Sequence, residues 1–148
     1  MKGVSLLVVI LIGISLTACK GKSRKAPKKN AGSPLTTHVL DTSAGVPARQ
    51  LPIKVFYEVV QNGASTWRLL ASNATNDDGR VSNLLTQQSF LAGRYRIRFD
   101  TETYFNLRGI TQYFYPYVEV VFIINNPSQH YHVPLLLSPF GYSTYRGS

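Results

Sequence analysis

The sequence predicts an all-β domain, a sandwich or barrel of short strands with one short helix. The first observation is the strict alternation in Arg94–Asp100, which on a strand places the aromatic and aliphatic residues on one face and the arginines on the other. The second is the close spacing of turn signals such as Asn62-Gly63 and Asp77-Asp78-Gly79. The third is that no segment has sustained helical periodicity.

The remaining elements follow from β-rich runs bounded by turn residues. These runs are Pro52 to Val60, Trp67 to Ala71, Tyr117 to Ile124, His130 to Leu137 and Tyr142 to Arg146. Thr101 to Leu107 is expected to form the short helix, with Thr101 as its cap and Gly109 just beyond its end.

One run has an unusual face. Between Val118 and Ile124, one face is fully apolar, and the other carries Val121 and Ile123 beside Glu119, where a solvated monomer would place polar residues. We therefore expect this strand to pair or pack across a subunit interface.

Charge is concentrated outside the expected domain. The 148 residues have a formal net charge of +9, but seven of the 16 Lys and Arg precede Asn30, and all seven Asp and Glu follow it. The nine later basic residues leave the domain with a net charge of +2. The basic segment has no aromatic residue to stack on a base, so we predict a solvated linker and no nucleic-acid binding; a tether to an anionic surface is the less favoured alternative.

The amino-terminal segment predicts export. Lys2 precedes an apolar run from Val4 to Leu16, which is shorter than the about 18 to 20 residues that span a bilayer. We assign residues 1–19 to a signal peptide, 20–32 to a basic flexible linker and 33–148 to a single folded domain. The destination is a bacterial envelope, periplasmic or lipid-anchored, or secretion by a eukaryotic route.

Cys19 is the only cysteine, so the chain forms no internal disulfide and no cysteine-based metal site. The residues Leu16-Thr17-Ala18-Cys19 resemble the lipobox of bacterial lipoproteins. Two interpretations stay open: Cys19 is lipidated and attaches the chain to a membrane, or it lies by chance near an ordinary cleavage point.

Histidines are the main candidates for chemistry, because the sequence has no glycine-rich phosphate loop, no Gly-x-Ser-x-Gly and no His-Glu-x-x-His motif. His130 and His132 are two apart on an expected strand and share a face, so they could bind a metal if His38 or Asp77 supplied a third ligand. The favoured alternative is that neighbouring backbone or tyrosine groups satisfy them.

Three separate motifs carry a resemblance to a known family. They are the carboxyl-terminal run His132 to Ser148, which ends in Tyr-Arg-Gly-Ser, the segment Leu35 to Asp41, and the turn Thr75 to Arg80. Together they resemble 5-hydroxyisourate hydrolases and imply a transthyretin-like (prealbumin) β-sandwich over the whole domain. Transthyretin, the hormone carrier, shares the fold but lacks both histidines, the turn arginine and the Tyr-Arg-Gly-Ser end.

The resemblance implies hydrolysis of 5-hydroxyisourate to 2-oxo-4-hydroxy-4-carboxy-5-ureidoimidazoline in urate degradation, without metal or organic cofactor. It assigns His38, Arg80, His132 and Ser148 as catalytic and Tyr145 as substrate-binding, alongside His38 and Arg80; His130 is a structural neighbour. Either histidine could be the general base, and Ser148 could act through its hydroxyl, its carboxylate or both. The family implies a homotetramer with active sites in a channel between dimers.

Two other functions are alternatives to the enzyme. A non-catalytic transthyretin-like carrier would hold a small aromatic ligand in the same channel without turnover. An adhesive β-sandwich on a lipid anchor would explain the amino terminus but not the carboxyl-terminal motif.

Overall fold

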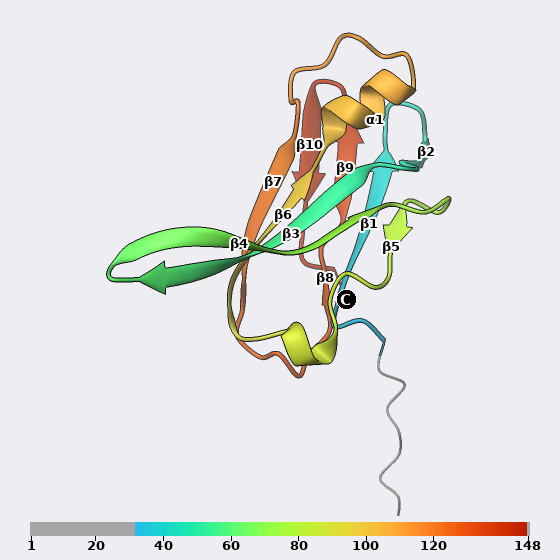
Figure 1. The fold of residues 1–148 in the computed structure, drawn as a ribbon. Coiled ribbons are helices and arrows are strands. Elements are labelled where there is room, and N and C mark those ends of the chain that lie inside the picture. The colour runs from blue at the N-terminus through green and yellow to red at the C-terminus, as the bar shows by residue number, and fades with distance from the viewer. Residues whose placement is uncertain (1–31, 148) are drawn as a thin grey trace, which may run out of the picture.

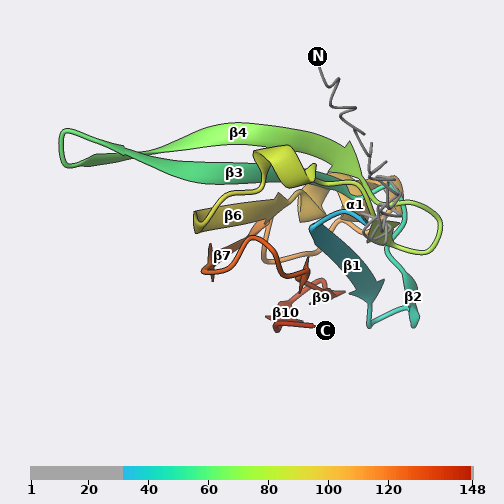
Figure 2. The same cartoon turned by 90° about the horizontal axis from the view of Figure 1, so that it is seen from below.

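The computed structural model describes residues 32–147, which form two β-sheets packed face to face, as Figures 1 and 2 show. The first sheet has six strands in the order β10-β9-β1-β2, with β5 and β8 also paired to β1. Its strands are β1 (Leu35–Asp41), β2 (Val46–Pro47), β5 (Arg80–Val81), β8 (Tyr131–His132), β9 (Leu135–Ser138) and β10 (Gly141–Thr144). The all-β sandwich is confirmed.

The second sheet has four strands in the order β4-β3-β6-β7. They are β3 (Pro52–Gln61), β4 (Ala64–Ala74), β6 (Gly93–Phe99) and β7 (Val118–Ile124). The predicted run Trp67 to Ala71 is only the middle of β4, which pairs with β3 along its whole length and extends with it well beyond the other strands (Figure 2). Propensity missed the ends of β4 because they are held by pairing with β3 rather than by apolar residues.

The core lies between the two sheets, and β6 shows how the sequence pattern builds it. Tyr95, Ile97 and Phe99 are completely buried, whereas Arg94, Arg96 and Arg98 face outward. The predicted alternation of this strand is therefore confirmed. The outward arginines are held by ion pairs to Glu58 and Glu119 on the flanking strands.

The edge strand β7 also follows its predicted alternation. Val118 and Ile124 are buried, while Val121 and Ile123 are 53% and 57% exposed on the outer face. An edge strand with exposed aliphatic side chains and unpaired backbone groups is a surface suited to association. Its use in a subunit interface stays a prediction.

The helix α1 (Thr101–Leu107) has the predicted bounds but not the predicted cap. Asp100 is the N-cap, and its carboxylate accepts a hydrogen bond from the backbone N–H of Thr103. Thr101 is instead buried and donates its hydroxyl to the carbonyl of Tyr115. The prediction of Thr101 was wrong because the loop after the helix folds back over it, a contact that local sequence does not encode. A 3-10 turn, η1 (Gln87–Ser89), is the other helical segment of the described chain.

The helix is fixed to the end of β1 by a buried hydrogen bond. The Tyr104 hydroxyl donates to Asp41 Oδ2 at 2.9 Å, and Asp41 is fully buried. Burial, followed by this bond, raises the pKa of Tyr104 to about 12. The tyrosine therefore stays protonated and keeps the end of β1 in place.

The predicted strand from His130 to Leu137 is in fact two strands, β8 and β9, with Val133 and Pro134 between them. Proline has no N–H to donate to the ladder, which explains the break. His130 lies just before β8, outside any strand. The last strand, β10, ends at Thr144 rather than Arg146.

Candidate active site

The site lies on the outward face of the first sheet, on its central strand β1. Leu35, Thr37, Val39 and Asp41 point into the core, and Thr36, His38 and Leu40 alternate with them, half-buried, on the opposite face. His38 therefore faces away from the core, as its position in the alternation requires.

Arg80 is brought to His38 by strand pairing. In the antiparallel pair of β1 and β5, Arg80 is the direct partner of His38. Such partners have Cβ atoms about 5 Å apart on the same face of a sheet. The turn that delivers Arg80 is held by Asn76, whose side-chain oxygen accepts hydrogen bonds from the backbone N–H of Arg80 at 2.8 Å and of Asp78 at 3.1 Å.

Gly79 makes this turn feasible. Its φ is +71°, and a Cβ at this position would lie 2.4 Å from the carbonyl oxygen of Val39. The Gly79 carbonyl accepts a hydrogen bond from the Val39 N–H at 2.8 Å. Glycine is needed here both for the backbone conformation and for the close approach to β1.

His132 reaches the same face through a second pairing of β1. Strand β8 runs parallel to β1 with His132 opposite Thr36. The Nδ1 of His132 is 2.9 Å from the Thr36 hydroxyl. Because Thr36 and His38 share a face, the structure brings His38, Arg80 and His132 together from three segments of the chain.

The carboxyl-terminal segment packs against His132. The Gly147 N–H donates to the His132 carbonyl at 2.9 Å. A Cβ on Gly147 would lie 2.5 Å from Cδ2 of the imidazole, so only glycine fits beside the ring. Ser148, the next residue in the sequence and a predicted catalytic residue, lies outside the described residues.

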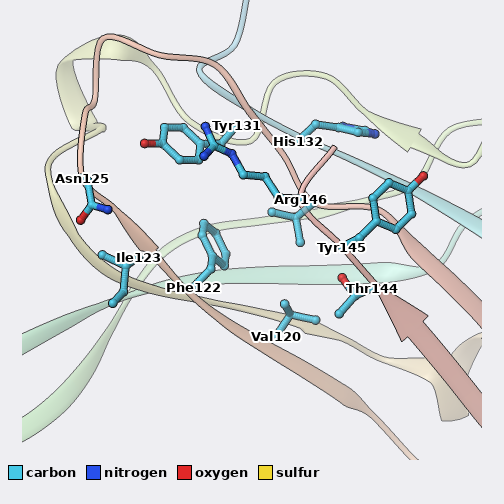
Figure 3. A pocket seen from close by; sticks show the side chains of 10 residues that line it. Val120, Phe122, Ile123, Asn125, Tyr131, His132, Thr144, Tyr145 and Arg146 are labelled. Atoms are coloured by element: carbon cyan, nitrogen blue, oxygen red, sulfur yellow. The ribbon is translucent and has the colours of Figure 1, made fainter. Parts of the chain in front are cut away.

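Tyr145 lies near His132 but is 58% exposed. Both line a pocket of about 230 Å³ between β7 and the carboxyl-terminal segment (Figure 3). Val120, Phe122 and Thr144 also line this pocket, whereas His38 and Arg80 do not. Tyr145 thus borders the site at His132 rather than at the Arg80 side.

Arg146 is occupied by structural contacts. Its guanidinium lies over the ring of Tyr131, 4.9 Å from the centroid, and donates to the Gln129 side chain at 3.3 Å. Figure 3 shows it beside Tyr131. These contacts favour a role for Arg146 in packing.

The electrostatics of the site keep its histidines neutral. Burial, followed by the positive charge of Arg80, lowers the pKa of His38 below the ordinary value of 6.5. Burial and then Arg80, with smaller contributions from His130 and His38, lowers the pKa of His132. Both imidazoles are therefore available as proton acceptors at neutral pH.

The metal alternative gains no support from the geometry of the described chain. Within residues 32–147, no three His, Cys, Asp or Glu side chains are arranged to hold a metal ion. His130 and His132 share the Thr36 hydroxyl as a neighbour, and the backbone of Thr36 also forms a hydrogen bond with His132.

Sequence reasoning missed three residues of the site. Thr36 and Gly147 were not singled out, and His130 was set aside as a structural neighbour. Thr36 could have been found from the alternation of β1, which places it on the face of His38. Nothing in the sequence indicates that Gly147 packs on the His132 ring.

No helix among the described residues is long and apolar enough to cross a membrane. The predicted signal peptide and the predicted lipobox at Cys19 lie outside the described residues.

A two-layer β-sandwich of this topology, with histidines and an arginine on one outer sheet face, defines a transthyretin-like protein with a polar site. The chain belongs to the HIUase/Transthyretin family, whose model matches residues 35–147.

Two relatives and one solved structure describe the similarity. The 5-hydroxyisourate hydrolase of Mus musculus is 50% identical over 116 residues, 78% of this chain and 96% of the relative. The 5-hydroxyisourate hydrolase of Halalkalibacterium halodurans is 43% identical over 118 residues, 77% of this chain and 97% of the relative. The structure of sea bream transthyretin in complex with thyroxine has a TM-score of 0.70 and 37% identity, covering 77% of this chain and 94% of that one. Such relatives thus occur in bacteria and in eukaryotes.

Proposed function

We propose that the chain hydrolyses 5-hydroxyisourate to 2-oxo-4-hydroxy-4-carboxy-5-ureidoimidazoline, a step of urate degradation. The observation that carries the proposal is the convergence of His38, Arg80 and His132 on one sheet face through the pairings of β1 with β5 and β8. Relatives named 5-hydroxyisourate hydrolase in a mammal and a bacterium support an enzyme over a non-catalytic carrier.

Hydrolysis of the cyclic amide needs an activated water and a group that stabilises the developing oxyanion. A neutral imidazole of His38 or His132 accepts the proton of the attacking water and returns it to the leaving nitrogen, an effect of about 10² to 10⁴ in rate. Arg80 offers a planar set of donors and a permanent charge, so it binds the carbonyl edge of the ring and stabilises negative charge on the attacked oxygen.

Two further residues complete the proposed site. Tyr145, which lines the pocket beside His132, contacts the substrate ring. Ser148 follows Gly147 in the sequence and contributes hydrogen-bonding groups to the water or the substrate. The reaction requires a base, a water and an oxyanion partner, and the proposal invokes no metal or organic cofactor.

The proposed assembly is a homotetramer of the domain 33–148. The outward face that carries His38 and Arg80 lies open on the single chain, so a second copy is needed to enclose a substrate there. The exposed side chains of Val121, Ile123, Phe140 and Tyr142 supply apolar surface for such contacts. Light scattering of the purified protein tests this assembly.

Export is proposed from the amino-terminal pattern alone. Residues 1–19 act as the signal peptide and 20–32 as the linker, and Cys19 is the proposed attachment point to a bacterial envelope. Labelling with a radioactive fatty acid in a bacterial host, with Cys19→Ala as the control, tests the anchor. An unlabelled, secreted product would support export and reject the lipid attachment at Cys19.

The activity is tested by generating 5-hydroxyisourate from urate with urate oxidase and following its ultraviolet decay. The protein carries no residues added after Ser148, and His38→Ala and Arg80→Ala are run beside it. We expect faster decay with the wild-type protein and a loss of that acceleration in both variants. Decay no faster than the blank, from a folded protein, would reject the hydrolase and make a screen for ligand binding the next step.

A further inference from the structure

Two imidazoles meet on the hydroxyl of Thr36. Its Oγ1 is 2.9 Å from Nδ1 of His132 and 3.0 Å from Nε2 of His130. Both distances are those of hydrogen bonds. Thr36 lies on β1 in register with His132, so its contact with His132 is set by strand pairing, and His130 lies just before β8.

A hydroxyl has one hydrogen to donate, which constrains the two rings. If both are neutral and both bonds form, Thr36 donates to one ring nitrogen and accepts from the other. The protonation of Nδ1 in His132 is therefore opposite to that of Nε2 in His130. The contact with His130 thus couples the tautomer of His132 to that of His130 and leaves two possible arrangements of the three groups.

The choice between the two tautomers matters because Nδ1 is occupied. Only Nε2 of His132 remains for a water or a substrate. Nε2 accepts a proton only when the hydrogen of the neutral ring is on Nδ1. In that state, His132 Nδ1–H donates to Thr36, and Thr36 donates to His130 Nε2.

This arrangement is also the one that survives proton transfer. When Nε2 takes a proton from water, the imidazolium still donates Nδ1–H to the Thr36 oxygen. The hydrogen bonds that join His132, Thr36 and His130 therefore stay in place. In the opposite arrangement, Thr36 donates to Nδ1, and His132 already carries its hydrogen on Nε2 and cannot act as a base.

We propose that Thr36 and His130 are positioning residues that hold His132 with its proton on Nδ1 and so leave Nε2 as the base of the reaction. The inference rests on the proposed hydrolysis and selects His132 between the two candidate bases. The other charged or titratable groups that face His132 are Arg80 on β5 and His38 on β1; Arg146 is engaged with Tyr131 and Gln129.

The test combines the tautomer of His132, read from ¹⁵N chemical shifts of its imidazole, with steady-state kinetics. The variants are Thr36→Val, which keeps the shape and removes the hydroxyl, Thr36→Ser, which keeps the hydroxyl, and His130→Ala. We expect the wild-type protein to show the Nδ1–H tautomer. Thr36→Val and His130→Ala should show mixed tautomers and lower kcat by at least about tenfold with KM little changed, and Thr36→Ser should restore both readouts.

The outcomes separate this inference from the proposed function. An Nε2–H tautomer in the wild-type protein, or an unchanged tautomer and kcat in Thr36→Val, would overturn the inference while turnover stands. A loss of kcat in Thr36→Val that Thr36→Ser does not restore also counts against it. Absent turnover in the wild-type protein would reject the hydrolase, and the tautomer measurement would still decide whether Thr36 and His130 fix the ring.

Discussion

The arginines on the outward faces of the two sheets have different neighbours. On the second sheet, Arg94 forms an ion pair with Glu58 at 2.7 Å, and Arg96 pairs with Glu119 at 3.1 Å. Arg96 also lies between the rings of Phe56 and Trp67, 4.6 and 4.7 Å from their centroids. These arginines contact carboxylates or aromatic rings within the sheet, although the buried Nε of Arg96 has no hydrogen-bond partner.

On the first sheet, Arg80 stands beside two histidines instead. Within residues 32–147, no carboxylate lies within 4.0 Å of its guanidinium nitrogens. After burial, the charge of Arg80 is the next cause that lowers the pKa of His38 and His132. Arg94 and Arg96 of the second sheet thus have carboxylate partners, whereas Arg80 has none among the described residues, as expected if its donors serve the proposed substrate.

The sharpest test of this difference is to replace one arginine from each sheet by lysine. We expect Arg80→Lys to lower kcat/KM for 5-hydroxyisourate by about 10² to 10³, because an ammonium cannot reproduce the planar, bidentate set of donors. The matched variant Arg94→Lys should keep the wild-type kcat/KM. Equal losses in both variants would show that the arginines act through the fold.

The glycines of the two sheets give the next contrast. Gly79 and Gly63 both have positive φ, +71° and +78°, but a Cβ on Gly63 meets no atom within 4 Å. Gly63→Ala should cost about 1 to 2 kcal/mol of unfolding free energy from the backbone conformation alone. Gly79→Ala should cost about 2 to 5 kcal/mol, because it also forces Val39 and β5 apart. Denaturant unfolding measures both, and equal costs would contradict the close approach.

A smaller effect, confined to activity, is expected at the carboxyl-terminal segment. Gly147→Ala should displace the His132 ring and lower kcat at least about tenfold with little change in unfolding free energy, since a small misplacement of a reacting group is costly. In Gly141→Ala, the new Cβ makes only an ordinary contact, 3.6 Å from the Ser138 hydroxyl, and activity should be retained. A crystal structure of Gly147→Ala with the His132 ring in its wild-type position would show that displacement of this ring does not explain a lower kcat.

The smallest expected effect concerns how kcat/KM and stability depend on pH. Because the pKa values of His38 and His132 are lowered below 6.5, each imidazole becomes half protonated only at a pH below 6.5. The kcat/KM should therefore rise through a pKa below 6.5 and be level at neutral pH. The unfolded chain binds these protons first, so the same histidines reduce stability as pH falls below 6.5.

Removing the charge of Arg80 should raise the pKa values of His38 and His132. In Arg80→Gln, imidazole NMR titrations should give a higher pKa for both histidines, whereas Arg94→Gln should leave them where they are. An unchanged titration in Arg80→Gln would mean that burial alone lowers the pKa values.

Part of the site was predictable because it depends on local pattern or on family motifs. The alternation of β1 places His38 away from the core, and the motif around the turn identified Arg80. The contact of His130 with Thr36 was not predictable, because it joins residues 94 positions apart. The N-cap of α1 was missed for a similar reason, since Thr101 is held by Tyr115 on the following loop.

The sequence by itself determined the all-β class, the buried faces of β6 and β7, and the candidate residues His38, Arg80 and His132. The class and the buried faces follow from side-chain periodicity, and the candidate residues follow from the resemblance of short motifs to a known family. Neither needs knowledge of distant neighbours. Only the tertiary structure decided that Thr36 links two histidines and that Gly79 must lie against Val39. Such contacts depend on the register between strands far apart in the chain, and register is set by pairing in the folded sheet.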